Sequence, residues 1–371
     1  EADITYRGVV AKGMGSLKLK TRDWVKVTGT LNEEYSVLYP SLEGRTMNLT
    51  PLGLEQHRGI ATRMVRNFPQ LFTDSVRIEA VASMSSRTVQ SMDAFCDRML
   101  ELRPDLSIER SSTEESMSCL NPYSPVSGKS NEWDLLWNGQ RTPALGAMNR
   151  VAEELVDVRP FCERLFLGDF SETLGDGGYS FMSDLYYVAI DLPNTPLKAD
   201  LCRYFTLSEL EGLNCVDNFM AYCYKGRYNR DGSTGRQWAL GWWVISDIVE
   251  KTVSDLRGGD CDVRLRFGHD GCLMAVFSLL GLEPWGCCFE DNLEAARSWD
   301  TSLTPMACNL QLVFFRNRKG DTLVRLLYNE KDFDLPLKKL HRKFYRAEDL
   351  LEFCLPRMEE AKKILDTQID G

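Results

Sequence analysis

The sequence predicts an α/β protein with a doubly wound, mostly parallel sheet and a mainly α-helical cap insertion. Three observations lead to this prediction. An alternating segment at 76–82 and a second one at 262–267 are each followed by a helical pattern. Between them, residues 119–235 are rich in Trp and Tyr, and their helical patterns are broken by loops. Because strand–turn–helix units are halves of βαβ motifs, the two flanking regions predict one α/β core.

The segment 49–53 opens the first clear helix, after 48 residues with only a weak pattern. Thr50 is suited to cap the helix, Pro51 suits its first position, and Pro69 ends it. The apolar face of this helix contains Leu54, His57, Ile60, Ala61, Met64 and Phe68.

The segment 76–82 alternates as a half-buried strand does. Its inward residues are Val76, Ile78, Ala80 and Ala82. A polar turn, Ser83 to Ser86, leads to a second helix. The residues of that helix that are spaced for burial are Val89, Met92, Phe95, Cys96, Met99 and Leu100.

Residues 119–235 are predicted to form a mostly helical insertion that caps the sheet edge. Pro122, Pro125 and Gly128 break the chain at its start, and the loop 175–178 interrupts it later. The predicted core then comprises residues 1–118 and 236–371. The alternative is that 119–235 belongs to the same domain with long loops.

The α/β pattern returns after Arg236. A long helix around Leu240–Val249, the strand at 262–267 and a helix through Leu280 follow in order. Asn309–Phe315 and Thr322–Tyr328 read as the two strands of a hairpin, and Ala347–Ile364 reads as a C-terminal helix.

Composition narrows the function classes. The net charge of −10 argues against broad nucleic-acid binding, which requires a positive field, but it leaves room for a small anionic substrate held by a few arginines. No apolar run is long enough for a membrane span. The twelve cysteines lack zinc-site spacing, so no metal site is expected; disulfides and buried free thiols both remain open.

His269 and Asp270 are the strongest candidates for chemistry. They directly follow the predicted strand 262–267, and ligands of open α/β sheets collect at the carboxyl ends of strands. In the functional interpretation, His269 donates a hydrogen bond to an anion and Asp270 gives a proton to a leaving group. In the structural alternative, Asp270 merely caps free amides of a helix.

Arg87 is the second candidate, since an arginine at the start of a helix after a strand adds a bidentate fork to an anion-favouring terminus. A surface arginine on the first turn is the alternative. His57 shares a face with Ile60 and Met64, which favours a core histidine. His341 lies in a basic run that is usually a solvated face; docking of an acidic partner is the lesser interpretation.

Several motifs together resemble the histidine acid phosphatases, branch two of the histidine phosphatase superfamily. The helix start at 49–59, the Ser86–Phe95 segment with Arg87, the Leu265–Asp270 segment and the strand-like 304–312 segment resemble that family's motifs in the correct order. The nearest relatives by this resemblance are bacterial enzymes related to multiple inositol polyphosphate phosphatases and phytases. The likeness covers residues 49–330.

The resemblance implies a phosphomonoesterase that acts on phosphorylated small molecules, with inositol phosphates among the candidates. Arg87 and His269 would bind phosphate, Asp270 would be the general acid, and no cofactor would be needed. It also implies a periplasmic or secreted location. In the family, a histidine in an Arg-His-Gly-x-Arg motif forms a phosphohistidine.

That nucleophile motif is absent from this sequence, whose nearest local string is Tyr6-Arg7-Gly8. Loss of a nucleophile removes covalent catalysis altogether. Two explanations compete: a nucleophile strand upstream of Glu1, or a non-catalytic phosphate-ligand binding protein on the same fold. A third interpretation is a structural α/β subunit without a ligand site. The sequence predicts neither an oligomeric state nor a particular phosphomonoester.

Overall fold

The computed structural model describes residues 48–128, 144–166, 169–318 and 320–369. Three parallel strands form its central sheet in the order β2-β1-β3. These are β1 (Arg77–Ala82), β2 (Ser107–Ser111) and β3 (Val263–Phe267). Within β1, Ile78 lies opposite both Ile108 and Val263. Two strands 185 positions apart in the sequence therefore lie side by side, as the predicted parallel sheet requires.

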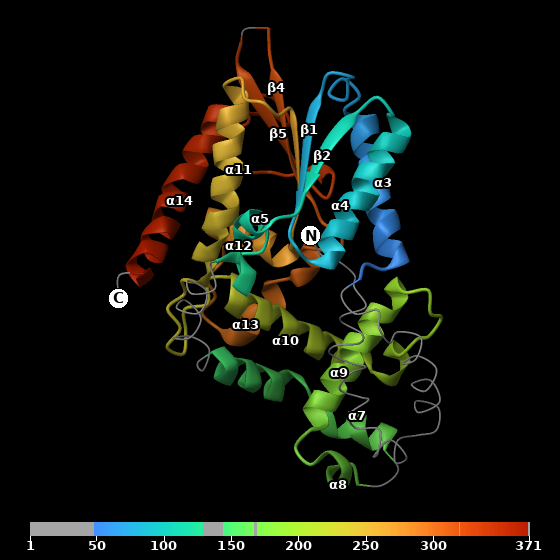
Figure 1. The fold of residues 1–371 in the computed structure, drawn as a ribbon. Helices are drawn as coiled ribbons and strands as arrows, with labels where there is room; N and C mark the ends of the chain where they lie inside the picture. Colours follow the sequence, from blue (N-terminus) through green and yellow to red (C-terminus); the bar gives the residue numbers. More distant parts are fainter. Residues whose placement is uncertain (1–47, 129–143, 167–168, 319, 370–371) are drawn as a thin grey trace.

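One face of this sheet is apolar and is covered by α3 (Pro51–Asn67) and α4 (Ser86–Leu102), which lie side by side in Figure 1. The strand residues that point to this face are buried with the inner residues of α4. Together they form one hydrophobic cluster that includes Ile78, Ala80, Ala82, Met92, Phe95, Met99, Val263, Leu265 and Phe267. The burial alternation predicted for β1 is confirmed. Thr50 Oγ1 accepts from Gly53 N at 3.1 Å, so the predicted cap of α3 is also present.

The opposite face of β3 carries arginines that pair with α11 (Gly241–Leu256). Arg264 Nε lies 2.6 Å from a carboxylate oxygen of Asp255, and Arg264 Nη1 lies 2.5 Å from Glu79 on β1. Arg266 Nη2 lies 2.6 Å from Asp247. The two faces of the sheet are therefore held differently, one by apolar packing and one by ion pairs to a helix.

A second, antiparallel sheet contains the predicted hairpin, β4 (Leu310–Arg316) and β5 (Thr322–Tyr328). The short strands β6 (Lys331–Asp332) and β7 (Tyr345–Arg346) both pair with β5. Within the described residues this sheet is separate from the parallel one, whereas the sequence predicted a single, mostly parallel sheet. Between β3 and β4 the chain forms α12 (Asp270–Leu280), α13 (Asn292–Ser298) and η7 (Thr301–Leu303), and β4 then pairs antiparallel with β5 instead of joining the parallel sheet.

The remaining helices lie below the sheets and beside them in Figure 1. A large hydrophobic cluster runs from the helices of the predicted cap into α12 (Asp270–Leu280) and α14 (Ala347–Ile369). The domain boundaries stay a prediction. The other elements are α5 (Glu114–Leu120), η3 (Pro125–Ser127), α7 (Val158–Leu165), α8 (Ser171–Leu174), α9 (Gly178–Asp191), η4 (Leu192–Asn194), η5 (Cys202–Tyr204), α10 (Leu207–Lys225) and η6 (Gln237–Leu240).

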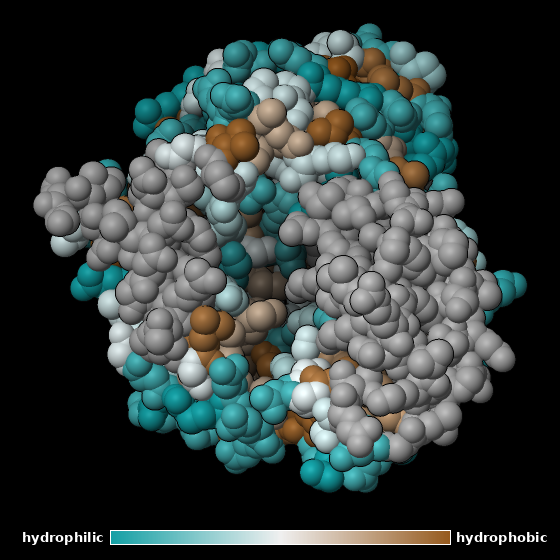
Figure 2. Space-filling view, turned by 60° about the horizontal axis from the view of Figure 1, so that its bottom comes forward, coloured by the Kyte–Doolittle hydropathy of each residue, from teal (hydrophilic) through white to brown (hydrophobic). Residues whose placement is uncertain are grey.

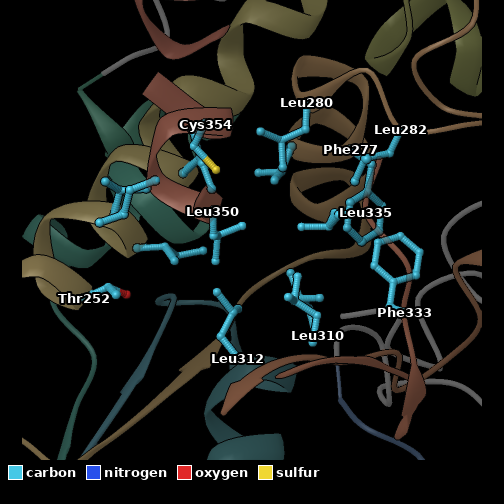
Figure 3. Close-up of a pocket in the computed structure, with 16 residues that line it drawn as sticks. Thr252, Phe277, Leu280, Leu282, Leu310, Leu312, Phe333, Leu335, Leu350 and Cys354 are labelled. Carbon is cyan, nitrogen blue, oxygen red and sulfur yellow. The ribbon is translucent and has the colours of Figure 1, made fainter. Parts of the chain in front are cut away.

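An apolar cavity of about 40 Å³ lies between α11, α12, α14 and the antiparallel sheet (Figure 3). Leucines such as Leu312 and Leu350 surround it, and Thr252 carries the only hydroxyl among its lining side chains. A cavity that binds benzene has roughly 150 Å³. This void is therefore a packing gap in the core.

All twelve cysteines lie in the described residues and all are free thiols, so the disulfide alternative is not realised. Burial raises the pKa of Cys96 to about 12 and that of Cys354 to about 11. Of the twelve, Cys288 is the exposed one. No helix among the described residues combines the length and the apolar character needed to cross a membrane.

Candidate functional site

The carboxyl ends of β1 and β3 bring the two predicted site segments together. Ala82 pairs with Phe267 as the last residues of their strands, and Ser83 N donates to Phe267 O at 3.0 Å. The turn from Ser83 into α4 and the turn from Gly268 into α12 consequently start next to each other. This adjacency is what the strand-end argument from the sequence predicted.

Arg87, the second residue of α4, reaches the imidazole of His269. Its Nη2 lies 3.2 Å from His269 Nδ1, and both side chains are partly buried. A guanidinium carries five N–H donors and no acceptor, so it can donate to more than one partner at once. Arg87 is thus part of this corner, not a purely surface residue on the first turn.

His269 is the N-cap residue of α12, and its backbone is extended there. Its Nε2 lies 3.4 Å from the hydroxyl oxygens of both Ser83 and Ser85, at the long end of hydrogen-bond distance. Gly268 brings the chain close to α5, because an added Cβ would lie only 2.9 Å from the Leu120 carbonyl oxygen. A side chain at 268 would therefore push this corner apart.

Asp270 is the first residue of α12, directly after His269. His269 occupies the N-cap position, so Asp270 would act on the free amides from the first turn of the helix and not as the N-cap residue. A carboxylate in the first helical turn is favourable for the helix dipole.

Lys225, the last residue of α10, approaches the start of α12 from the predicted cap. Its Nζ lies 3.0 Å from the centre of the Tyr123 ring, and an added Cβ at Gly271 would meet Lys225 Cε at 2.9 Å. Burial lowers the pKa of Lys225 to about 8, and Cys272 and Asp270 offset part of that effect. Burial also raises the pKa of Tyr123 well above its usual range.

The other two histidines lie away from this corner. His57 is buried at 5% exposure, with its ring edge-on to Phe267 at 6.3 Å between centroids, which fits the predicted core histidine. His341 is exposed and forms an isolated bridge with Phe344. Lysines of the basic run pair with acidic neighbours: Lys339 with Asp334 and Lys343 with Asp332, both at 2.6 Å.

No histidine is therefore placed beside His269 and Arg87 to act as a second, nucleophilic imidazole. Tyr6-Arg7-Gly8 lies outside the described residues. Within those residues no cluster of three or more His, Cys, Asp or Glu side chains could hold a metal ion. Figure 2 shows a face of the molecule that is hollowed near its middle, with hydrophilic and hydrophobic side chains both visible in the hollow.

Sequence reasoning missed Ser83, Thr88, Lys225 and Tyr123 as members of this corner. The polar turn at 83–86 was visible in the sequence, but nothing in it marked which hydroxyl faces His269. Lys225 and Tyr123 are 102 positions apart and come from the least interpretable region, so no local spacing could join them.

Comparison with known proteins supports the fold. No protein-family model matches the chain, and no characterised protein matches it by sequence. Among solved structures, the Bifidobacterium longum multiple inositol polyphosphate phosphatase in complex with inositol hexasulfate is similar with a TM-score of 0.73 at 16% identity. The match covers 94% of this chain and 88% of that chain.

The phytase from D. castellii is also similar, with a TM-score of 0.62 at 14% identity over 93% of this chain and 76% of that one. The same B. longum enzyme in complex with phosphate gives a TM-score of 0.71 at 16% identity, over the same shares of the two chains as the inositol hexasulfate complex. At such identities the likeness shows the fold alone. This chain has the α/β fold of inositol polyphosphate phosphatases and phytases.

Proposed function

We propose that this protein acts on phosphomonoesters of small molecules, inositol phosphates among them, at a centre formed by Arg87, His269 and Asp270. The observation that carries the proposal is the 3.2 Å approach of Arg87 Nη2 to His269 Nδ1 at the carboxyl ends of β1 and β3. Two nitrogen groups from different elements converge there, and planar N–H donors suit phosphate oxygens. The B. longum phosphatase, which shares this fold, is solved in complex with inositol hexasulfate and in complex with phosphate.

In the proposed arrangement Arg87 and His269 hold the phosphate oxygens, and Asp270 protonates the oxygen of the departing alcohol. Lys225 adds a positive charge on the cap side, which favours substrates with more than one anionic group. The first candidate function is hydrolysis, as the resemblance to histidine acid phosphatases implies.

A specific observation favours a second candidate, phosphate-ligand binding without hydrolysis. The chain has three histidines, and a phosphohistidine needs one beyond His269 in the site. His57 is buried against Phe267 and His341 is exposed elsewhere. The residues present can hold a phosphate and supply a proton, but none of the three histidines is placed to accept the phosphoryl group.

The two candidates are separated by assaying turnover and binding on the same protein. Phosphate release from inositol hexakisphosphate and from p-nitrophenyl phosphate is measured together with calorimetric binding of inositol hexakisphosphate. Release that is lost in Asp270→Asn while binding remains supports hydrolysis. Ligand binding without phosphate release supports the second candidate if that binding is lost in Arg87→Ala.

If neither ligand binds nor is hydrolysed, or if binding survives Arg87→Ala unchanged, the proposed centre is wrong. Arg98→Ala serves as a matched control, because Arg98 lies on the same helix and bonds to Thr62 and Glu101 away from His269. A periplasmic or secreted location belongs to the same proposal, and the twelve free thiols give it no support.

A further inference from the structure

A buried pair of hydroxyls lies behind His269, on the side away from Arg87. Ser83 and Thr88 are both fully buried, and their hydroxyl oxygens are 2.7 Å apart. Ser83 Oγ in turn lies 3.4 Å from His269 Nε2. Buried hydroxyls need hydrogen-bond partners, and these two find them in each other, the imidazole and the backbone.

The available donors and acceptors fix the direction of each hydrogen bond between Thr88, Ser83 and His269. Thr88 Oγ1 lies 2.9 Å from the Ser83 carbonyl oxygen and 2.8 Å from the Ser85 carbonyl oxygen. A carbonyl oxygen cannot donate, so the single Thr88 proton points to one of these carbonyls. The Ser83 proton must then point to Thr88 Oγ1, so Ser83 can only accept from His269 Nε2–H, which also lies 3.4 Å from Ser85 Oγ.

The other side of the ring gives the same answer independently. A guanidinium only donates, so Arg87 Nη2–H requires His269 Nδ1 to be the unprotonated acceptor. Both ends of the imidazole are therefore consistent with one form, the neutral ring with its proton on Nε2. Which ring nitrogen of a neutral histidine carries the proton follows from the hydrogen-bond partners of the two ring nitrogens.

We propose that Ser83 and Thr88 are positioning residues that fix His269 as the Nε2–H imidazole and turn its bare Nδ1 toward Arg87 and the phosphate position. The inference rests on the proposed function in that a phosphate takes the place between Arg87 and His269. When the anion enters, Arg87 transfers its hydrogen bond from Nδ1 to a phosphate oxygen. Nδ1 then gains a proton, either from solvent or from a singly protonated phosphate, and donates it back as a hydrogen bond to the ligand.

The charged groups that surround this corner come from three helices. Arg87 belongs to α4, Asp270 to α12 and Lys225 to α10. Arg87 is cationic at all accessible pH values, so it opposes a charged imidazole until an anion separates the two. The proposed proton uptake is thereby coupled to phosphate binding and does not occur in the empty site.

The tautomer can be read directly, because the chain has only three histidines. Nitrogen-15 NMR of the histidine-labelled protein distinguishes the two neutral tautomers and the imidazolium. His341→Gln and His269→Asn assign the signals. We expect His269 to be the Nε2–H form without ligand, and an Nδ1–H signal for the native protein would overturn the proposal without any variant of the hydroxyl pair.

Binding of inorganic phosphate tests the consequence. At a pH where phosphate is the dianion, calorimetry in two buffers of different ionisation enthalpy should show uptake of about one proton per site. Thr88→Val removes the acceptor for the Ser83 proton and should weaken phosphate binding about three- to tenfold, with a mixed His269 tautomer, since one hydrogen bond is worth about that much.

Thr88→Ser keeps the hydroxyl and should therefore restore both the phosphate affinity and the Nε2–H tautomer of His269. If Thr88 only filled space, Thr88→Ser would not restore them. Ser118→Ala is the control, because Ser118 Oγ on α5 donates an exposed hydrogen bond to the Glu115 carbonyl. A Thr88→Val protein with native tautomer and native phosphate affinity would refute the inference. If native protein binds no phosphate, the proposed function fails, while the tautomer measurement still decides the role of Ser83 and Thr88.

Discussion

The guanidinium of Arg87 can make two parallel hydrogen bonds to a phosphate, whereas an ammonium acts as a point charge. Arg87→Lys should therefore weaken phosphate binding about tenfold although the charge is kept. Calorimetric titration with inorganic phosphate measures this, with Arg98→Lys on the same helix as the control. Equal affinity of the native and Arg87→Lys proteins would show that Arg87 does not contact the anion.

Lys225 gives a pH-dependent prediction, since burial lowers its pKa to about 8 in the folded protein. Between about pH 8 and pH 10.5 the unfolded chain binds more protons than the folded one, so folded stability rises with pH across this window. Lys225→Met lacks this pH-dependent change in stability, because a methionine side chain does not titrate. We expect the variant to exceed the native protein in melting temperature near pH 7, and the difference to shrink above pH 8.

The control for Lys225 is Lys251→Met, since Lys251 lies exposed on α11. Its melting-temperature difference from the native protein should stay nearly constant over the same pH range. A Lys225→Met advantage that grows with rising pH would contradict the assigned burial of the amine.

At the same scale, the sequence singles out Arg87, His269 and Asp270 because each lies in the turn or the first helical residues after a strand with clear alternation, and their roles stay predictions. It was insufficient for Ser83, Thr88 and Lys225. Which hydroxyl lies under the imidazole depends on the rotation of α4 about its axis. The approach of Lys225 depends on how α10 packs against α12, and neither is written in local spacing.

Helices α11 and α12 pack closely where Gly241 begins α11. An added Cβ there would lie 2.6 Å from the Ala275 carbonyl oxygen, too close for any side chain. Gly241→Ala should therefore destabilise the protein by about 1–3 kcal/mol through overpacking. Gly146→Ala is the opposite case, because its Cβ would meet only Arg150 Nη1 at 3.5 Å within a helical segment.

Urea unfolding measures both glycine variants. Gly146→Ala should be neutral or stabilising by up to about 1 kcal/mol, because alanine favours the helix. If both substitutions had the same effect, the close approach of α11 to α12 would not be the cause.

The periodicity of the sequence predicted the presence of helices and strands well, but it predicted their ends less well. The strand at 77–82, the hairpin β4–β5 and α14 are all present, although α14 continues through Pro356 to Ile369. β6 and β7 were missed because two-residue strands have no alternation to detect. Both form by antiparallel pairing with β5.

The whole molecule depends on contacts between distant segments, and Arg264 is a clear instance. It joins β3 to Glu79 on β1 and to Asp255 on α11, with its own side chain only 11% exposed. Arg264→Met would leave Glu79, Asp255 and the exposed Asp260 without this cation and should cost about 2 kcal/mol, less than for a fully buried pair because Glu79 is partly solvated. Urea unfolding measures the loss.

The control is Arg77→Met, which removes the more exposed pair with Asp262 and should cost clearly less stability than Arg264→Met. A larger effect for Arg77 than for Arg264 would show that the ion pairs between β3 and α11 are not what holds that face of the sheet.

Global architecture was the hardest part to predict. The parallel pairing of β1 and β3 could be anticipated from two strand–helix units. The hydrophobic cluster that runs from α7, α9 and α10 into α12 and α14 could not, because 43% hydrophobic residues can pack in many ways. Whether a nucleophile lies beside His269 also depends on how the entire chain folds.

The distribution of thiols gives the protein one chemically addressable position. Cys288 is exposed, while the other eleven cysteines are buried or partly buried. Its sulfur lies 4.0 Å from the Arg227 carbonyl oxygen, just beyond the end of α10, which carries Lys225. A maleimide fluorophore would therefore attach preferentially at Cys288, and its emission could report ligand arrival without engineering any cysteine away.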